Sequence, residues 1–508
     1  MGRVRLAPSM TFGEAVEAAT GAAGDAWLAA DGERATLREL VDRADALAAR
    51  LRGAGVHPGQ HVGVLLPNGV RYAEAFLAVV RLGAVVVPLD PQLPDREFDA
   101  VARAVPLAAT LAERPRPLPG AVAGTVDAGG WRLPGTPERG APARPRRDET
   151  AAVFLTSGTT GEPKPVPLTH HQLVRPLVAL QRLHAAFFAG SPLQTAARVA
   201  TVGRRHGTRL LRAAGRQTWC TATPFRGMAG HQVFAGSLLL GHNLVTARAF
   251  HPRRTLELAD AHRVNVLACT PAMVELLLRV GDVARYDLSS LLVIGVGGGP
   301  AAPDLVERAQ RRFGCAVTVG YGSTELGGGV LATRLEDSPH TQTRTVGRPF
   351  PGAEVRVVDA DGADVPAGRA GELLCRTRDD GPWLATGDLA RRDTCGNVEI
   401  LGRADDLVVR GGQNVHPLEV ERAVEELSGV RRCAVVGVGS PAEQQLWAFV
   451  VPEDGHELGP DAVRRHCRTA LAPARQPDRV RIVPALPVTE HGEVRRNVLR
   501  AQAGEENV

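Results

Sequence analysis

Lysine is almost absent from this chain of 508 residues. Lysine and arginine together number 60, and the single lysine is Lys164. Arginine serves as the cation at every other basic position, so a reaction that needs a lysine side chain can draw on Lys164 alone. The basic residues are dispersed, often beside Asp or Glu, and the formal net charge is only +5. This pattern does not indicate nucleic-acid binding.

Paired cysteines and long apolar runs are also lacking. The seven cysteines lie far apart without a CxxC pair, so the sequence suggests neither a zinc site nor a redox pair. Free thiols suit a reducing compartment. The N-terminal residues lack the hydrophobic stretch of a signal peptide, and Arg81 interrupts the longest apolar run, AFLAVVRLGAVVVPL. We therefore expect a cytoplasmic protein without a membrane partner.

Short apolar runs alternate with helical patterns over most of the chain. HVGVLLPN, YAEAFLAVVRLG and AVVVPLD, between residues 61 and 90, predict a strand, a helix and a second strand. The same order recurs at 243–270 and 291–322, which is typical of a parallel sheet covered by helices. The Pro- and Arg-rich stretch 113–149 is predicted as a surface loop, and VGRRHGTRLLRAAGR (202–216) as a basic helix.

Beyond residue 320 the pattern changes. AEVRVVD, GELLCRT and VEILG, between residues 353 and 402, predict antiparallel strands separated by turns. From about Arg403 onward, strand and helix patterns predict a small α+β domain of a size that suits a separate unit.

One loop suits a phosphate ligand. TSGTTGEPK (156–164) offers hydroxyl groups, glycines that leave backbone N–H groups accessible, and one cation. Its spacing differs from the GxxxxGK[ST] pattern, so this is not an ordinary P-loop. The second glycine loop, GVGGGP (295–300), lacks the third glycine of GxGxxG and supports a dinucleotide fold only weakly.

Five motifs occur in a fixed order along the chain: TSGTTGEPK, YGSTE (321–325), GELLCR (371–376), ATGDLA (385–390) and GRADDLVVRGGQNVHPLEVE (402–421). The series resembles the adenylate-forming superfamily of acyl-CoA synthetases, peptide-synthetase adenylation domains and luciferases, and is most similar to the acyl-CoA synthetases. The resemblance runs from about Asp31 to Leu499. It implies an α/β fold with two domains. A large domain, 1–402, would combine layered α/β sheets with a small β-barrel, and a small α+β domain, 403–508, would follow on a hinge.

The resemblance also implies an ATP site. Glu325 would bind Mg²⁺, and Tyr321 would stack on adenine. Asp388 would bind the ribose hydroxyls. The implied nucleotide-binding residues are Thr156, Ser157, Gly158, Thr159, Thr160, Gly161, Lys164, Gly298, Gly299, Tyr321, Gly322, Ser323, Thr324, Asp388 and Arg403, and the implied catalytic residues are Lys164, Thr324, Glu325 and Arg403.

Three further groups follow from the resemblance. Phe225, Arg226, Gly227, Gly297 and Gly320 would line the substrate pocket, Asp405 would be the hinge, and Gly411 with Gly412 would line a coenzyme A tunnel. The alternative for Tyr321 is a core aromatic residue, and the alternative for Asp405 with Asp406 is a solvated turn.

Two departures from the family pattern bear on function. Glu493, in LPVTEHGEVRRNVLR (486–500), stands where the family has a lysine, and its carboxylate would repel a substrate carboxylate and a phosphate. Arg495 or Arg496 could substitute for that lysine from a shifted position, or the small domain could tolerate the change. Arg226 stands where the family has an aromatic residue. It would suit a second anionic group or a very small anion, unless it faces solvent.

These observations predict an enzyme that activates a small acid with ATP and Mg²⁺. It would form a mixed anhydride with AMP, release pyrophosphate and transfer the acid to a nucleophile, by default coenzyme A. One alternative is a diazotase-type enzyme that activates nitrite for transfer to an aryl amine. The other is a non-catalytic nucleotide-binding relative.

Overall fold

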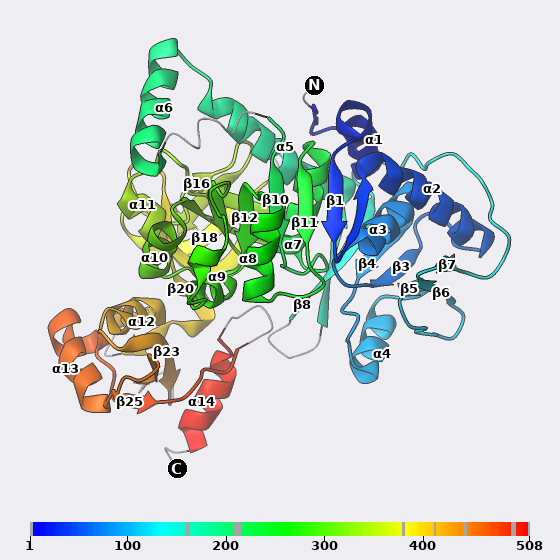
Figure 1. The fold of residues 1–508 in the computed structure, drawn as a ribbon. Coiled ribbons are helices and arrows are strands. Elements are labelled where there is room, and N and C mark those ends of the chain that lie inside the picture. The colour runs from blue at the N-terminus through cyan, green and yellow to red at the C-terminus, as the bar shows by residue number, and fades with distance from the viewer. Residues whose placement is uncertain are drawn as a thin grey trace. The chain divides into compact units, whose positions relative to one another are not determined.

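The computed structural model describes residues 4–157, 163–207, 215–377, 381–410, 413–439, 444–488 and 494–505 (Figure 1). The chain divides into two compact units. The first consists of residues 1–298, 305–337 and 350–352, and the second of residues 299–304, 338–349 and 353–508. The predicted boundary at 402/403 falls within the second unit and stays a prediction.

A mostly parallel sheet runs through the first unit. Its strands lie in the order β15 (Gly328–Ala332), β14 (Ala316–Ser323), β13 (Val293–Val296), β12 (Val266–Cys269), β10 (Thr218–Thr221), β11 (Asn243–Thr246), β1 (Trp27–Ala30) and β2 (Glu33–Thr36). The strands from β14 to β1 pair in parallel, whereas β15 pairs antiparallel with β14, and β2 with β1. With helices α8 (Pro252–Ala261) and α10 (Pro303–Phe313) between them, these strands confirm the order predicted for 243–270 and 291–322.

A second sheet of the first unit has the order β7 (Gly130–Arg132), β6 (Val122–Asp127), β5 (Leu107–Ala112), β3 (His61–Leu65), β4 (Val85–Pro88), β8 (Thr150–Ser157) and β9 (Pro163–Thr169). The predicted strand-helix-strand at 61–90 is confirmed, with α3 (Val70–Leu82) joining parallel strands β3 and β4. The stretch 113–149 is not all loop, because β6 extends the sheet beside β5 and turns back into β7.

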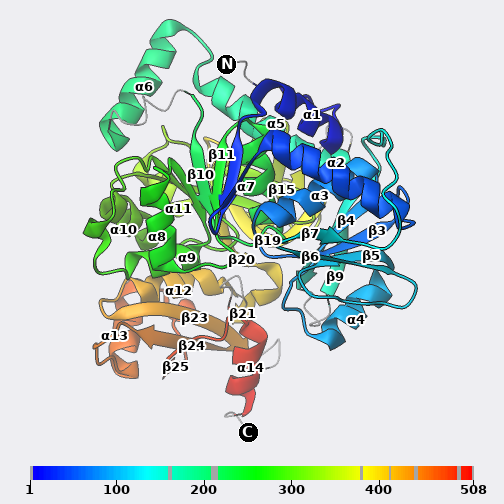
Figure 2. The same ribbon diagram turned by 45° about the vertical axis from the view of Figure 1, so that its right-hand side comes forward.

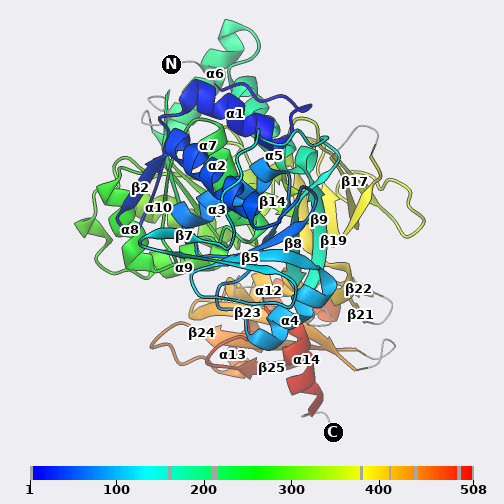
Figure 3. The same ribbon diagram turned by 90° about the vertical axis from the view of Figure 1, so that its right-hand side faces the viewer.

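Helices α1 (Phe12–Ala23), α2 (Leu37–Gly53) and α3 pack on one another, as Figures 2 and 3 show. Near residue 202 the predicted basic helix is displaced. Helix α6 spans Pro192–His206, begins at a capping box of Ser191 with Gln194 and ends at Gly207. Residues 208–214 of that prediction lie outside the described residues.

The second unit contains an antiparallel sheet of β17 (Glu354–Val358), β18 (Ala370–Arg376), β19 (Leu384–Arg392) and β20 (Val398–Arg403), where the sequence predicts antiparallel strands. The α+β part follows. It comprises the hairpin β21 (Val408–Arg410) and β22 (Gln413–Val415), the sheet β23 (Val430–Val438), β24 (Gln445–Pro452) and β25 (Arg479–Ile482), and the helices α12 (Pro417–Glu425), α13 (Pro460–Ala470) and α14 (Arg496–Glu505). Across both units, the described helices include none that is long and apolar enough to cross a membrane.

Candidate functional site

The carboxyl ends of β13 and β14 form a wall of bare backbone. Gly297 follows β13, and a Cβ added there would lie 3.7 Å from the carbonyl oxygen of Gly320 on β14. Gly298 has a φ of +77°, and a Cβ there would lie 3.9 Å from the Cβ of Ala229. Parallel α/β sheets bind ligands at this edge. The structure therefore places Gly297 beside Gly320, with Gly298 following Gly297, and a ligand role for these three glycines stays a prediction.

The YGSTE motif lies at the end of β14 and in the turn to β15. Tyr321 is partly exposed, and Glu325 is exposed. A Cβ at Gly322 would lie 2.1 Å from the carbonyl oxygen of Gly328, so the close β14–β15 pairing requires glycine there. The amide of Gly327 donates to the carbonyl of Thr324 at 2.9 Å, which closes the turn.

The chemistry of this turn fits a magnesium ion. Mg²⁺ prefers oxygen ligands and is often held by one or two carboxylates together with substrate phosphates. Glu325 supplies an exposed carboxylate, and the preceding residue, Thr324, is partly exposed and carries a hydroxyl group. No group of three or more His, Cys, Asp or Glu that could hold a metal occurs in the part of the chain that the structure describes. Any Mg²⁺ at this turn would therefore depend on nucleotide oxygens.

The phosphate loop predicted at 156–164 belongs to the hairpin of β8 and β9, with Thr156 opposite Lys164. Lys164 is exposed. Gly158, Thr159, Thr160 and Gly161 lie outside the described residues, and Ser157 is described by its backbone alone. Prolines occupy positions 163, 165 and 167 of β9. Because β9 is an edge strand and alternate residues share one side, these missing N–H groups need not interrupt the pairing with β8.

The segment after β10 is anchored from within the first unit. The side chain of Asn68 accepts from the amide of Phe225 at 2.7 Å and donates to the carbonyl of Thr223 at 2.9 Å. Phe225 is fully buried, with its ring centroid 5.1 Å from that of Phe234. Phe225 is therefore part of the aromatic core, and Gly227 is the N-cap of α7 (Met228–Leu239).

Arg226 is paired with a carboxylate. Its Nη2 lies 2.7 Å from Oδ2 of Asp90, which follows β4, and the two side chains are 19% and 27% exposed. Neither Asn68 nor Asp90 was among the predicted site residues. No local motif marks them, because each contacts a segment more than 130 positions away in the sequence.

The second unit holds the residues predicted for ribose binding. Asp388 on β19 lies opposite Arg403 on β20, and Nη1 of Arg403 is 3.2 Å from Oδ1 of Asp388. The same nitrogen donates to the carbonyl of Thr386 at 2.9 Å. Gly387, which lies between Thr386 and Asp388 in the chain, has a φ of +70°. A Cβ at Gly387 would lie 2.8 Å from Nη2 of Arg403. Gly299, which was also predicted to bind the nucleotide, is partly exposed in the second unit.

Asp405 is an exposed residue in the short helix Ala404–Asp406, so its side chain is compatible with either a hinge or a solvated turn. Its neighbour Asp406 is fixed, because it forms ion pairs with Arg496 and Arg500 on α14. Arg496 also binds Glu421 on α12 at 2.5 Å, and these carboxylates raise the pKa of Arg496 despite its burial. Arg496 is thus already paired with two carboxylates of the second unit, those of Asp406 and Glu421. Gly411, Gly412 and Glu493 lie outside the described residues.

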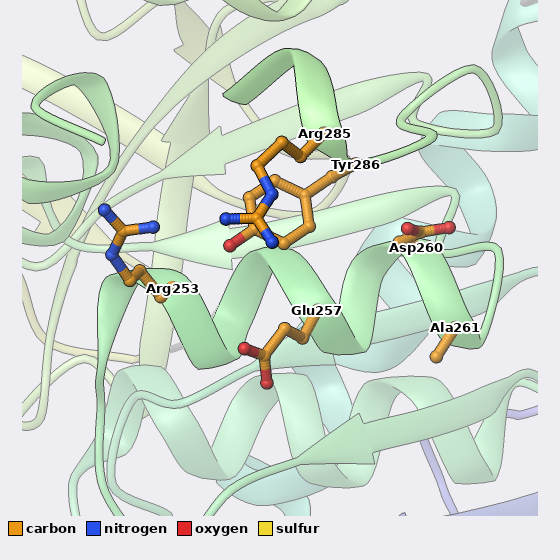
Figure 4. Close-up of a pocket in the computed structure, with 6 residues that line it drawn as sticks. All are labelled: Arg253, Glu257, Asp260, Ala261, Arg285 and Tyr286. Atoms are coloured by element: carbon orange, nitrogen blue, oxygen red, sulfur yellow. The ribbon is translucent and has the colours of Figure 1, made fainter. Parts of the chain in front are cut away.

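A separate depression of about 430 Å³ contains none of the predicted site residues. It is lined by Arg253, Glu257, Asp260, Ala261, Arg285 and Tyr286, over α8 (Figure 4). Asp282 binds Arg253 at 2.7 Å and Arg285 at 3.0 Å, and these hydrogen bonds lower the pKa of Asp282 to about 2. Both arginines therefore already have a carboxylate partner.

Residues 16–387 match the AMP-binding enzyme profile, and residues 419–493 match the AMP-binding enzyme C-terminal domain. The chain belongs to the AMP-binding enzyme family. It is 30% identical to a feruloyl-CoA synthase from an Amycolatopsis species, covering 93% of this chain and 95% of the relative. It is 31% identical to a 2-hydroxy-7-methoxy-5-methyl-1-naphthoate–CoA ligase from Streptomyces carzinostaticus, covering 93% and 89%.

The fold agrees with solved structures of similar proteins. ATP-bound MatB from Rhodopseudomonas palustris superimposes with a TM-score of 0.81 and 24% identity, covering 98% of this chain and all of that one. The predicted α/β fold class, with a large N-terminal and a small C-terminal domain, is confirmed. The predicted resemblance to acyl-CoA synthetases and the prediction of an AMP-forming ligase are confirmed as well.

Proposed function

We propose that this AMP-binding enzyme activates a ring-bearing carboxylic acid with ATP and transfers it to coenzyme A. The observation that carries the proposal is the identity of 30–31% over nearly the whole chain with enzymes named for feruloyl and naphthoate groups. The bare backbone at Gly297, Gly298 and Gly320 supports it, because a flat ring can lie against a wall without side chains.

In the proposed first step, a carboxylate oxygen of the acid attacks the α-phosphorus of ATP. The bond to the bridging oxygen breaks, and pyrophosphate leaves with its electron pair. Lys164 and the β8–β9 hairpin would bind the β- and γ-phosphates, and Thr324 the α-phosphate. Glu325 would hold Mg²⁺, which offsets phosphate charge. Preorganised charges of this kind supply most of the acceleration in phosphoryl chemistry.

In the second step, the thiolate of coenzyme A attacks the acyl carbon and AMP leaves. We place the hinge for the rearrangement between the steps at Asp405, shortly after the predicted boundary of 402/403. Asp406 supports this assignment, since its ion pairs with Arg496 and Arg500 tie it to α14. The flexible joint would therefore lie on the N-terminal side of Asp406.

The pairing of Arg226 with Asp90 bears on the choice of acid. A guanidinium that already has a carboxylate partner offers less attraction to a second anionic group on the substrate. The geometry supports an acid with one carboxylate. Among the described residues, no contact favours nitrite transfer to an aryl amine over activation of a carboxylic acid.

The test is pyrophosphate release from Mg·ATP with benzoates, cinnamates, naphthoates, aliphatic acids, dicarboxylates and nitrite. Each is assayed with and without coenzyme A, and nitrite also with an aryl amine. An acyl-CoA product from one ring-bearing acid supports the proposal. A preference for aliphatic acids contradicts the substrate class, a signal with nitrite contradicts the reaction, and ATP binding without turnover of any acid favours a non-catalytic relative.

A further inference from the structure

Arg175 on α5 (His170–Phe187) is a buried cation without a carboxylate partner in the described part of the chain. The residue is 6% exposed, and its Nη2 donates to the carbonyl of Leu326 at 2.9 Å. Nε and Nη1 make no hydrogen bond to any described residue. Burial lowers the pKa of Arg175 to about 10. A buried charge without an ion pair costs stability, so packing alone would favour an apolar residue here.

The surrounding sequence explains why Arg175 has no ion pair nearby. Residues 163–256 contain neither Asp nor Glu. Around Leu326, the adjacent acid is Glu325, whose side chain is exposed. Arg175 therefore holds the turn from inside through a backbone carbonyl, while the neighbouring carboxylate remains open to solvent on the outside.

Helix α5 also packs against the turn that contains Leu326 and Gly327. Pro176 lies inside α5 and has no N–H, so the carbonyl of Gln172 cannot receive its usual helical hydrogen bond. Gly327 packs against that carbonyl, since a Cβ at Gly327 would lie 2.9 Å from the oxygen of Gln172. Gly327 has a φ of +71°, which also favours glycine. Three features of one region thus fix residues 326 and 327: the guanidinium, the proline and the glycine.

The same helix continues directly from the phosphate hairpin. Thr169 ends β9 and caps α5, where its hydroxyl accepts from the amide of Gln172 at 3.2 Å. The amide of Thr169 in turn donates to the side chain of Gln172 at 2.9 Å. A strand and a capped helix, continuous in the chain, therefore connect Lys164 to the turn of Thr324 and Glu325.

We propose that Arg175 is a positioning residue that fixes the 324–327 turn relative to the β8–β9 hairpin, so that Glu325 meets a metal-bound nucleotide in the correct place. This inference rests on the proposed function of Glu325 in binding Mg²⁺. A residue with this role need not stabilise the fold. Its loss should weaken metal-dependent nucleotide binding while leaving the folded protein intact.

The experiment compares Arg175→Met and Arg175→Lys with the wild type in the full chain. ATP binding is titrated at a series of Mg²⁺ concentrations, and thermal unfolding is measured without nucleotide. We expect Arg175→Met to need at least fivefold more Mg²⁺ for half-maximal ATP binding, with a Tm equal to or above that of the wild type. Arg175→Lys keeps a donor and a charge, so it should recover at least half of the loss on a logarithmic scale.

Arg182→Met is the matched control, because Arg182 is an exposed arginine on the same helix. It should leave both measurements unchanged. The proposal for Arg175 is overturned if Arg175→Met keeps the wild-type Mg²⁺ dependence, or if its Tm falls and the folded fraction binds ATP normally. If ATP binding by the wild type does not depend on Mg²⁺, this result contradicts the proposed role of Glu325 itself, and with it the role of Arg175 that rests on it.

Discussion

Asp388 and Arg403 lie directly opposite each other on β19 and β20, with 3.2 Å between Oδ1 and Nη1. The carboxylate is 15% exposed and the guanidinium 52% exposed. Surface ion pairs of this kind add about 0–1 kcal/mol to stability. We therefore expect the pairing to contribute more to the orientation of the Asp388 carboxylate than to the stability of the sheet.

Asp388→Asn should weaken ATP binding with little effect on stability. The amide keeps the shape but loses the charge that strengthens hydrogen bonds from two ribose hydroxyls, and hydrogen bonds to charged groups contribute about 1.5–3 kcal/mol. We expect the KM for ATP to rise at least about tenfold, measured by pyrophosphate release. Glu354→Gln is the control, because Glu354 forms an equivalent cross-strand pair with Arg376 at 2.6 Å. Equal effects of both variants would contradict a ligand role for Asp388.

The single lysine makes a chemical test unusually specific. An amine-reactive reagent can modify Lys164 and the chain's terminal amine, and Lys164 is exposed. We expect modification to abolish pyrophosphate release and Mg·ATP to protect against it. Lys164→Arg keeps the charge but removes the amine, so its residual activity should resist the reagent. Continued sensitivity of Lys164→Arg would place the essential amine elsewhere.

The local elements could be predicted from the sequence because their signals are local. The apolar runs of β3, α3 and β4 repeat with strand and helix periods, and the structure reproduces them. The bare backbone at Gly297, Gly298 and Gly320 could also be predicted, since glycines at the ends of buried strands form a short-range sequence pattern. Strand β6 was missed because the Pro- and Arg-rich residues around it mask a short strand that gains its partner from β5.

The contacts that position the site could not be predicted in the same way. Asn68 holds Thr223 and Phe225, Asp90 pairs with Arg226, and Arg175 reaches Leu326. Each contact joins segments that the sheet order brings together, so no spacing in the sequence encodes it. The expectation that Arg226 attracts a second anionic group of the substrate was based on Arg226 alone. The structure shows that the carboxylate of Asp90 already pairs with Arg226.

Asp90→Asn should change substrate preference. Removal of the carboxylate leaves Arg226 able to attract an anionic group, because the ion pair at 2.7 Å is lost. We expect the ratio of kcat/KM for a dicarboxylate to that for the matching monocarboxylate to rise at least about fivefold. Asp25→Asn is the control, since Asp25 pairs with Arg216 at 2.6 Å. An unchanged ratio in Asp90→Asn would show that Arg226 does not face the substrate.

Glu493→Lys restores the family residue at a position outside the described residues. If the substrate is a carboxylic acid, an ammonium group in place of a carboxylate removes repulsion from both the acid and the α-phosphate. We expect the single-turnover rate of adenylate formation to rise about tenfold or more, with ATP binding little changed. Glu490→Lys makes the same charge change three positions away and should have no such effect. An unchanged or lower rate in Glu493→Lys would contradict the hypothesis that adenylate formation is slow because Glu493 replaces the lysine of the family.

Glu425, at the end of α12, gives the second unit a pH-dependent stability. Burial, together with the nearby carboxylates of Glu421 and Asp304, raises the pKa of Glu425 to about 8, although the hydrogen bond from the amide of Cys433 and the charge of Arg432 lower it. The folded unit therefore retains a proton that the unfolded chain has already lost, so stability falls as the pH rises from about 4.5 to about 8.

Glu425→Gln should remove the loss of stability that Glu425 causes as the pH rises. The amide is neutral at every pH, and its oxygen can still accept from the amide of Cys433, now at 2.9 Å from Oε1. We expect the stability of the variant relative to the wild type to rise by about 3–4 kcal/mol between pH 5 and pH 8. Hydrogen exchange of the β23 amides would report the change in this unit. Glu426→Gln, at the exposed neighbour, should leave the pH dependence intact, and a wild-type slope in Glu425→Gln would mean that Glu425 is already ionised in the folded protein.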